Sequence, residues 1–411
     1  MSDILLNKSE LKNNQTIIIS GSKSETNRLL LLQALYPNLK IENASNSDDS
    51  EVMKNALQSV GKSSEINVHH AGTAMRFLTS FFAIQEGLEV VISGSERMHE
   101  RPIKILVDAL NQLGSDIKYL NHEGFPPIKI IGKKIQGNKV LIDANVSSQY
   151  ITSLMLIGSS LPNGIEIQLD GTITSIPYIK MTLSILQSLG IKAEFENNII
   201  KIPHTEKLSN DTFVVESDWS SASYFYSLIA LSKIDTGITL GYFKQNSLQG
   251  DAVLAEIYQS FGVETTFTGN KIILKKIENP SIKNINLNLN NAPDIAQTII
   301  VTCLGLGITC SLTGLHTLKI KETDRLQALK NELEKFGASV SISADSIHLN
   351  NSVVFQNKTI AIETYQDHRM AMAFAPLVLK QSLVIKNADV VSKSYPDFWN
   401  DLKLLNIDLR Y

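Results

Sequence analysis

The stretch LKNELEKFGASVSISADSIHL, residues 329–349, carries the pattern that decides the fold. Apolar residues recur with helical spacing up to Phe336, Gly337 follows, and polar and apolar residues then alternate as in a strand. A glycine directly after a helix favours the left-handed conformation that ends many helices. The stretch therefore predicts a helix, a glycine C-cap and a short strand.

The same pattern occurs five more times along the chain, around Gly61, Gly114, Gly190, Gly262 and Asn406. With Gly337 included, successive spacings are 53, 76, 72, 75 and 69 residues. A turn or capping residue lies 10–13 residues before each of the six: Asp49, Pro102, Pro177, Asp251, Asp324 and Pro396. A helix, a glycine and a strand are common in α/β proteins, but six copies at a similar offset make chance a poor explanation. The pattern predicts six α/β units, grouped three and three into two domains because one unit cannot close a core.

Composition fits a globular protein and excludes several classes of function. The chain has 411 residues, 43% hydrophobic and 19% charged, with a net charge of −3, so it lacks the basic character of a nucleic-acid-binding protein. No apolar stretch is long enough to span a membrane, and no signal-peptide pattern opens the chain. Cys303 and Cys310 match no metal motif and are expected to be buried thiols. We expect a cytoplasmic protein that binds neither nucleic acid nor membrane.

The segment ISGSKSETNRLLLLQAL, residues 19–35, places cations and hydroxyls at a strand-to-helix turn. Ser22 or Ser24 can cap the helix, whose free N–H groups favour an anion. Lys23 and Arg28 add donors suited to phosphate or carboxylate. The spacing is not that of a Walker loop. Alone, the segment fits a capped helix with solvated cations as well as it fits a binding site.

Similar polar clusters occur at other expected helix starts in both halves of the chain. Six cations lie at such positions: Lys23, Arg28, Arg76, Arg101, Arg325 and Arg369. Lys321 and Lys393 add two more, while the second half also brings acids, among them Asp294, Glu322 and Asp367. A solvated helix cap is the commoner explanation for each cluster alone. If the helix ends converge, they predict a cleft between the two halves for small polyanions.

Seven motifs, taken together and in this order, closely resemble those of the 5-enolpyruvylshikimate-3-phosphate synthase family of enolpyruvyl transferases. They are GSKSETNR (21–28), AGTAMR (71–76), RP (101–102), SSQ (147–149), KETDRL (321–326), DHRMAM (367–372) and KSYPDF (393–398). The resemblance covers about residues 15–400. It implies two inside-out α/β domains, each of three βαβαββ units, with the active site in the interdomain cleft. Domain I would comprise residues 1–20 and 217–411, and domain II residues 21–216.

The resemblance also implies the reaction. The enolpyruvyl group of phosphoenolpyruvate would pass to the 5-hydroxyl of shikimate 3-phosphate, releasing phosphate through a tetrahedral intermediate, with no metal or other cofactor. The implied contacts to shikimate 3-phosphate are Lys23, Ser24, Arg28, Ser147, Ser148, Gln149, Ser175, Tyr178, Asp294, Thr317 and Lys321. Those to phosphoenolpyruvate are Lys23, His70, Gly72, Thr73, Arg101, Gln149, Arg325, His368, Arg369 and Lys393. Its implied catalytic residues are Lys23, Asp294 and Glu322, and a monomer is the default expectation.

Each implied catalytic residue has a part in proton transfer. Glu322 would protonate the methylene carbon of phosphoenolpyruvate and later take the proton back. Asp294 would receive or orient the hydroxyl proton, and Lys23 would pass a proton to the departing phosphate.

The sequence departs from the family pattern at three positions. His70 replaces the usual Asn, Phe77 replaces the Pro that commonly follows AGTAMR, and Thr317 stands where Asn is frequent. Gly72 matches the small residue associated with glyphosate sensitivity in the family, so sensitivity is a hypothesis.

Other functions stay open at this point. UDP-N-acetylglucosamine 1-carboxyvinyltransferase typically has Asn after the opening lysine and a loop cysteine, whereas here Ser24 follows Lys23 and no cysteine precedes Cys303. An RNA 3′-phosphate cyclase would need a catalytic histidine that we do not identify. A non-catalytic paralogue that binds phosphate esters is the third alternative, although binding alone would not require both Asp294 and Glu322.

Overall fold

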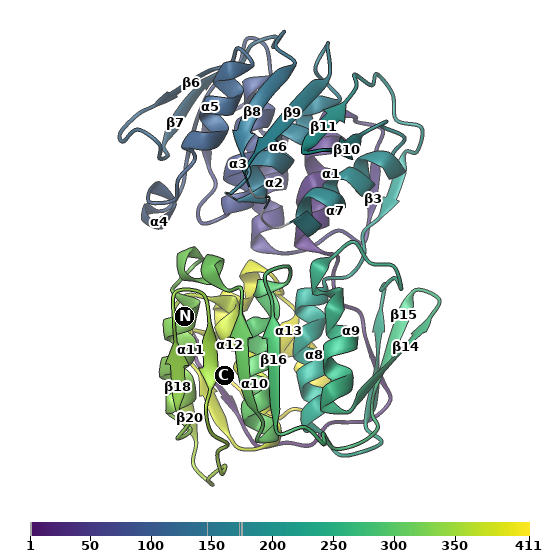
Figure 1. The fold of residues 1–411 in the computed structure, drawn as a ribbon, viewed down its shortest axis with the longest axis vertical. Coiled ribbons are helices and arrows are strands. Elements are labelled where there is room, and N and C mark those ends of the chain that lie inside the picture. Colours follow the sequence, from purple (N-terminus) through teal and green to yellow (C-terminus); the bar gives the residue numbers. More distant parts are fainter. Residues whose placement is uncertain (1, 146, 172, 174–175) are drawn as a thin grey trace. The chain divides into compact units, whose positions relative to one another are not determined.

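The computed structural model describes residues 2–145, 147–171, 173 and 176–411. It divides into two compact units, one formed by residues 1–20 with 216–411 and the other by residues 21–215 (Figure 1). We refer to them as unit 1 and unit 2. Glu216, expected in domain II, belongs to unit 1.

Unit 1 contains three four-stranded sheets, with strand orders β2-β13-β15-β14, β16-β17-β19-β18 and β20-β21-β1-β22. In each sheet the first two strands are parallel and the remaining pairs are antiparallel. The elements are β1 (Ile4–Leu6), β2 (Gln15–Ile17), α8 (Trp219–Leu231), β13 (Gly237–Gly241), η1 (Gly250–Val253), α9 (Leu254–Ile257), η2 (Tyr258–Phe261), β14 (Val263–Thr268), β15 (Lys271–Lys276), β16 (Asn284–Asn288), η3 (Pro293–Ile295), α10 (Ala296–Leu306), β17 (Thr309–Thr313), η4 (His316–Ile320), α11 (Arg325–Glu334), β18 (Val340–Ile342), β19 (Ile347–Leu349), β20 (Ile360–Ile362), α12 (His368–Phe374), η5 (Ala375–Leu379), β21 (Leu383–Ile385), η6 (Ala388–Lys393), α13 (Phe398–Leu404) and β22 (Leu409–Arg410).

Unit 2 contains two sheets of the same topology, β4-β5-β7-β6 and β8-β9-β11-β10, and a two-stranded parallel pair, β3-β12. Its elements are α1 (Lys23–Leu35), β3 (Lys40–Glu42), α2 (Asp48–Gln58), β4 (Glu65–Asn67), α3 (Gly72–Ala83), β5 (Glu89–Ser93), α4 (Glu96–His99), α5 (Lys104–Gln112), β6 (Asp116–Tyr119), β7 (Ile128–Ile131), β8 (Lys139–Asp143), α6 (Ser148–Gly158), β9 (Ile165–Asp170), α7 (Ile176–Ser188), β10 (Glu194–Glu196), β11 (Ile199–Ile202) and β12 (Thr212–Val214).

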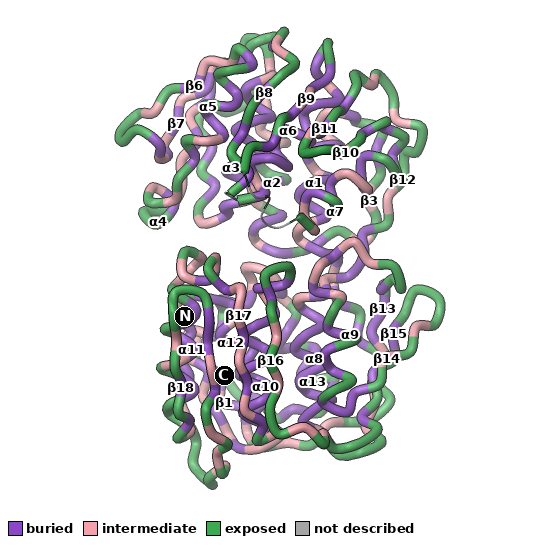
Figure 2. Tube along the Cα trace, viewed as in Figure 1, coloured by how far each residue is buried: buried purple, intermediate pink, exposed green. Residues whose placement is uncertain are grey.

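Helices occupy the middle of each unit and the sheets lie outside them (Figure 1). In unit 1, α8 and α10 are buried almost throughout, and in unit 2 so are α3 and α6 (Figure 2). Such helices lack a polar face, which is the pattern of a helix enclosed on all sides. The predicted α/β class with inside-out units is confirmed.

The predicted helix C-caps are also present. The φ angles of Gly61, Gly114, Gly190, Gly262 and Gly337 lie between 71° and 103°, and Asn406 has φ 69°. These values are left-handed, a conformation in which glycine pays no steric penalty and asparagine a small one. Each residue closes a helical segment and turns the chain into the next loop or strand.

One copy of the repeat is incomplete, which corrects the expectation of six equal units. The first copy joins β12, α1, β3 and α2, and among the described residues no hairpin strands follow α2. The chain runs instead directly into β4, the first strand of the next copy. The missing hairpin accounts for the short spacing of 53 residues between Gly61 and Gly114.

The N-terminal segment completes two sheets of unit 1. β1 lies between β21 and β22, with Leu5 opposite both Val384 and Arg410, and β2 pairs with β13. Because β21 and β22 lie near the C-terminal end of the chain, the last copy of the repeat takes its fourth strand, β1, from the opposite end of the sequence.

Candidate active site

The central helices of unit 2 present polar residues at their N-terminal ends. Helix α1 begins at Lys23 with Ser22 as N-cap, and α6 begins at Ser148 with Ser147 as N-cap. On the otherwise buried α3 and α6, Thr73 and Gln149 are not buried, and Gln149 Nε2 donates to Thr73 Oγ1 at 3.2 Å. The first turns of α3 and α6 are thus side by side, and their free N–H groups favour anions.

Asp49 ties Lys23 to His70 at this end of unit 2. Its carboxylate lies 3.1 Å from Lys23 Nζ and 3.6 Å from His70 Nε2. Asp49 belongs to the first turn of α2, and the sequence identified it only as a helix-start residue. Asp49 is the counter-charge of Lys23 because α2 packs against α1. That packing cannot be predicted from the residues next to Asp49 in the sequence.

Arg101 lies directly over the first residue of α3. Nη1 of Arg101 donates to the carbonyl of His70 at 3.4 Å. A Cβ at Gly72 would come within 2.4–2.6 Å of the guanidinium atoms of Arg101, so any larger residue would displace this cation from its present position. The structure therefore brings together His70, Gly72, Thr73, Arg101 and Gln149, five of the residues that the resemblance assigned to phosphoenolpyruvate.

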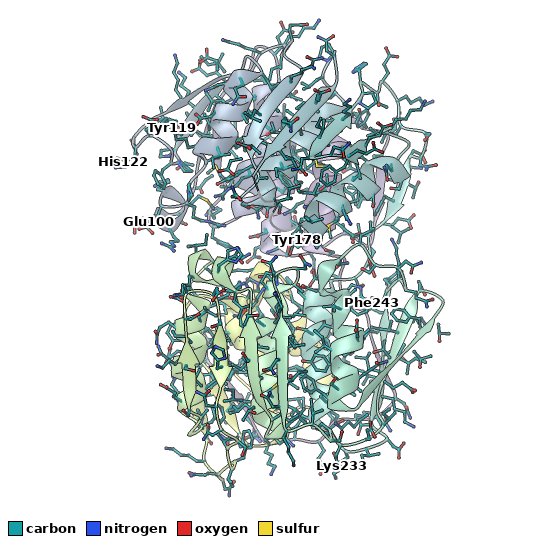
Figure 3. The ribbon with its side chains drawn as sticks, in the orientation of Figure 1. Glu100, Tyr119, His122, Tyr178, Lys233 and Phe243 are labelled. Atoms are coloured by element: carbon teal, nitrogen blue, oxygen red, sulfur yellow. The ribbon has the colours of Figure 1, made fainter. Side chains whose placement is uncertain are left out.

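Arg28 is a buried cation one turn farther along α1. Its Nε donates to Thr182 Oγ1 at 2.8 Å and its Nη1 to the Ser24 carbonyl at 2.6 Å. Burial lowers the pKa of Arg28 to about 10, while Tyr178 and Glu25 act in the opposite direction. Among the described residues no carboxylate lies within ion-pair distance of this guanidinium. Tyr178 lies in the first turn of α7 (Figure 3), and Ser175, which was predicted to bind the same substrate, lies outside the described residues.

Arg76 is also buried but faces the protein backbone. Its Nη1 donates to the Gly72 carbonyl at 3.0 Å and its Nη2 to the Pro102 carbonyl at 2.9 Å. Burial, and then the charge of Arg101, lower the pKa of Arg76 to about 10. Arg76 and Arg28 lie within helices rather than at their first residues, which corrects the predicted position.

The polar group of unit 1 is centred on Arg325, the first residue of α11. This side chain is only 2% exposed and contacts three carboxylates, those of Asp367 at 2.6 Å, Glu322 at 2.8 Å and Asp294 at 2.9 Å. Burial would lower the pKa of Arg325, but the three carboxylates raise it above its usual value. Asp367 also caps α12 by accepting a hydrogen bond from Arg369 N. The sequence showed Asp367 as a cluster member but did not predict that it holds Arg325.

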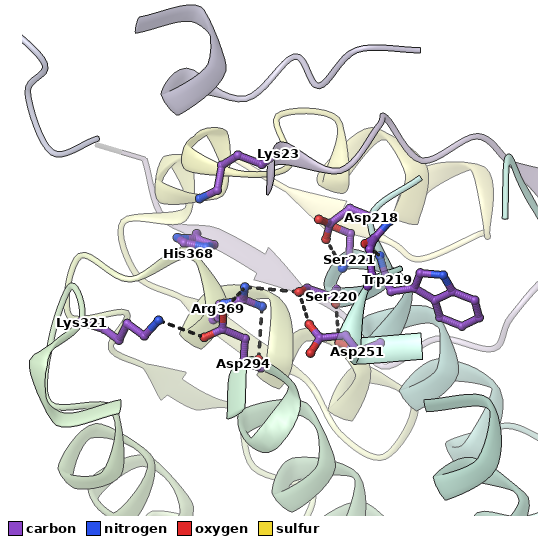
Figure 4. A network of polar contacts seen from close by, with 12 residues as sticks. Lys23, Asp218, Trp219, Ser220, Ser221, Asp251, Asp294, Lys321, His368 and Arg369 are labelled. Atoms are coloured by element: carbon purple, nitrogen blue, oxygen red, sulfur yellow. Dashed lines mark hydrogen bonds and ion pairs between the residues drawn. The ribbon is translucent and has the colours of Figure 1, made fainter. Parts of the chain in front are cut away.

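Asp294, which lies in η3 just before α10, is surrounded by cations. Arg369 Nη2 lies 3.3 Å and Lys321 Nζ 3.7 Å from its carboxylate oxygens (Figure 4). Burial alone would raise the pKa of Asp294, but Arg369, Lys321 and Arg325 together hold it well below its usual range. Asp294 is therefore ionised at neutral pH.

Arg369 connects this group to α8. Its Nη2 lies 3.4 Å from Ser220 Oγ, which donates a short hydrogen bond to Asp251 (Figure 4). Burial, followed by the charge of Asp294, raises the pKa of Asp251 to about 7. Ser220 and the role of Asp251 were missed, because the sequence pattern marks Asp251 only as a helix-start residue. The first turns of α8 and α12 and the start of α10 thus meet in unit 1.

The remaining predicted residues of unit 1 lie in shorter elements. His368 is buried as the first residue of α12, with Nδ1 3.8 Å from Asp367. Thr317 lies in η4, and its hydroxyl has no hydrogen-bond partner among the described residues. Lys393 ends η6 rather than starting a helix, and its Nζ donates to the Gln366 carbonyl at 2.6 Å.

In the part of the chain that the structure describes, no group of three or more His, Cys, Asp or Glu side chains has the arrangement of a metal site. None of the described helices combines the length and apolar character needed to cross a membrane. Cys303 and Cys310 are buried and free, as expected.

Comparison with known proteins identifies relatives for nearly the whole chain. A family model described as EPSP synthase (3-phosphoshikimate 1-carboxyvinyltransferase) matches residues 62–402. A 3-phosphoshikimate 1-carboxyvinyltransferase of Bacteroides fragilis is 42% identical over 391 residues, which cover 94% of both chains. One from Haemophilus influenzae is 35% identical, covering 94% of this chain and 95% of its own. An EPSP synthase structure from Acinetobacter baumannii superimposes with a TM-score of 0.81 at 20% identity over the full length of both chains. The enolpyruvyl transferase NikO from Streptomyces tendae has the same fold, with a TM-score of 0.76 at 12% identity over 99% of this chain and 98% of its own.

Proposed function

The chain belongs to the EPSP synthase family of 3-phosphoshikimate 1-carboxyvinyltransferases, and we propose that it performs this transfer with the two groups of helix-end residues described above. It is an enzyme of the shikimate pathway, in which the enolpyruvyl group of phosphoenolpyruvate passes to shikimate 3-phosphate with release of phosphate. The sister activity on UDP-N-acetylglucosamine is not favoured by these relatives.

The environment of Arg28 is the single observation that most supports the proposed ligand set. A buried guanidinium with no carboxylate at ion-pair distance among the described residues is costly, and the more distant charge of Glu25 offsets only part of the effect of burial. An anionic ligand would supply the missing charge. Shikimate 3-phosphate carries both a phosphate and a carboxylate, and the planar fork of Arg suits either group.

We assign the two substrates to overlapping sets of residues, as the family resemblance implies. For shikimate 3-phosphate the proposed contacts are Lys23, Ser24, Arg28, Ser147, Ser148, Gln149, Ser175, Tyr178, Asp294, Thr317 and Lys321. For phosphoenolpyruvate they are Lys23, His70, Gly72, Thr73, Arg101, Gln149, Arg325, His368, Arg369 and Lys393. The proximity of Arg101 to Gly72 and of Gln149 to Thr73 supports the second set in unit 2.

Glu322 is proposed as the acid that protonates the methylene carbon of phosphoenolpyruvate, and as the base that removes a proton in the elimination step. Its contact with Arg325 favours the carboxylate in the free protein. Bound phosphoenolpyruvate would draw Arg325 toward its own anionic groups and so weaken the contact that favours the carboxylate of Glu322. The acid would then form only when the donor substrate is present.

Asp294 is proposed to orient the 5-hydroxyl group and receive its proton. The three cations around it keep it ionised, which suits an acceptor but makes it a weak base. When bound anions engage Lys321 and Arg369, these two cations interact less strongly with Asp294. The pKa of Asp294 then rises, which makes its carboxylate a stronger base. Lys23 would supply the proton to the departing phosphate.

Phosphate release tests the reaction and the role of Glu322 together. Purified enzyme is mixed with phosphoenolpyruvate and either shikimate 3-phosphate or UDP-N-acetylglucosamine. We expect release only with the shikimate ester, and a fall in kcat of about 10²- to 10⁴-fold in Glu322→Gln because general acid–base catalysis is lost. Glu334→Gln, an exposed position on α11, is the matched control and should retain full activity. Release only with UDP-N-acetylglucosamine would assign the sister activity. Tight binding of shikimate 3-phosphate without turnover would identify a non-catalytic protein.

Units 1 and 2 are proposed to be the family's domains I and II, and the enzyme to be a cytoplasmic monomer that needs no cofactor. Light scattering of the purified chain tests the monomer. Retention of activity after treatment with a chelator and dialysis tests the absence of a required metal. A dimer mass or a chelator-sensitive activity would overturn the respective point.

A further inference from the structure

Arg28 has aromatic rings near it from two elements of unit 2. Its guanidinium carbon lies 5.6 Å from the centroid of the Phe77 ring on α3 and 6.0 Å from that of Tyr178 on α7. Both distances fall within the range of a cation–π contact. Phe77 is fully buried, so its ring is fixed by the packing around α3 and is not free to swing away.

The edge of the same guanidinium is held by hydrogen bonds. Nε is used by Thr182 and Nη1 by the Ser24 carbonyl, while no hydrogen bond joins Nη2 to any described residue. Ring contacts fix the plane of the guanidinium and the two hydrogen bonds fix its rotation within that plane. One pair of N–H donors is left for a ligand.

We propose that Phe77 is a positioning residue of the shikimate 3-phosphate site, whose ring holds Arg28 in the orientation that presents Nη2 to an anionic group of that substrate. The inference rests on the proposed function and deepens it. Phe77 does not touch the substrate but acts through Arg28. An aliphatic side chain at this position would fill space without offering a π face, so the guanidinium would regain freedom that binding must then remove.

Shikimate 3-phosphate binding by the intact chain, measured by calorimetry and by KM, tests this role. Immobilising a side chain as flexible as arginine corresponds to a loss of affinity of about 2- to 10-fold, which is the increase in Kd and KM expected for Phe77→Leu. Because the chemical step is untouched, kcat should stay within about twofold of the wild-type value. Phe77→Tyr keeps the ring and should restore binding.

Phe82→Leu is the matched control for the loss of a buried ring. Phe82 lies on the same helix, is 1% exposed and packs edge-on against Phe81, and no cation lies over its ring among the described residues. We expect it to lower stability as Phe77→Leu does while leaving Kd unchanged. If Phe77→Leu does not fold, Phe77→Met takes its place.

The binding and turnover measurements distinguish a failure of the positioning role of Phe77 from a failure of the proposed function. Equal Kd values for Phe77→Leu and Phe82→Leu, in an enzyme whose wild type binds and turns over shikimate 3-phosphate, would overturn the positioning role alone. A wild type that neither binds nor turns over this ester would overturn the proposed function and the inference with it. An increase in Kd confined to Phe77→Leu and reversed in Phe77→Tyr would support the inference.

Discussion

Replacing Arg325 by methionine should destabilise unit 1 strongly, because three carboxylates depend on this one cation. Asp367 is 0% exposed, whereas the side chains of Asp294 and Glu322 are 14% and 28% exposed. After the substitution Arg369 and Lys321 still neutralise Asp294, and water reaches Glu322. Asp367 is left as a buried charge without its main partner. Removing one member of a buried ion pair costs about 3–5 kcal/mol, a large part of a typical stability.

The effect should depend on pH with a defined sign. In the variant the charge of Arg325 no longer helps to lower the pKa of Asp294 in the folded state, so this part of the stability is missing above the ordinary pKa of the carboxyl group. In the wild type the pKa of Asp294 is lowered in the folded state, so stability is lost as pH falls. The deficit of the variant is therefore largest near pH 7 and shrinks as pH falls.

Urea denaturation followed by tryptophan fluorescence measures this deficit in the relevant unit. The chain has two tryptophans, Trp219 and Trp399, and both lie in unit 1. Arg410→Met is the matched control, because Arg410 pairs with Asp408 at the surface, where its side chain is 70% exposed. It should cost less than about 1 kcal/mol. If Arg325→Met cost no more than Arg410→Met, or if its deficit grew at low pH, the electrostatic argument would be refuted.

Two further predictions concern the site and the core. Gly72→Ala places a Cβ within 2.6 Å of the Arg101 guanidinium, which must move. We therefore expect the KM for phosphoenolpyruvate to rise about 10- to 100-fold, while the free energy of unfolding changes little. An unchanged KM would contradict the role of this contact. Burial, followed by the charge of Lys380, lowers the pKa of Lys276 to about 8 from 10.5. Between about pH 8 and 10.5 the unfolded chain therefore keeps a proton on Lys276 that the folded chain has lost. The free energy of unfolding in urea should rise with pH over this range. Lys276→Met should remove that rise, and parallel pH profiles for the two proteins would refute it.

Local signals in the sequence predicted the elements of the fold but not all of its connections. A glycine after a helix is a local signal, and Gly190, Gly262 and Gly337 all adopt the expected left-handed conformation. Asp324 likewise caps α11 as expected, accepting hydrogen bonds from two backbone N–H groups. The shorter spacing before Gly114 was visible, but its cause, a copy without a hairpin, requires knowing which strands pair.

The candidate site shows the same division between local and long-range information. The motifs predicted Lys23, Glu322 and Arg325 as site residues, because an unusually large number of charged residues lie at the expected helix starts. The partners that hold them, Asp49 and Asp367, act across 26 and 42 residues of sequence, and a cap or turn residue looks the same whether or not it faces a cation. Contacts of that kind follow from the packing of buried helices and have no signature in a single sequence.

The position of β1 has a consequence for the order in which the polypeptide matures. Unit 2 is one uninterrupted stretch, so it can collapse as soon as residue 215 has been synthesised. Strand β1 must wait longer, because it is inserted between β21 and β22 and the latter ends at Arg410. A ribosome that stops before β22 would release a chain with one finished unit and one sheet lacking an edge strand. Such a product exposes unpaired backbone N–H and C=O groups along β1, which makes it prone to aggregation and a substrate for chaperones and proteases.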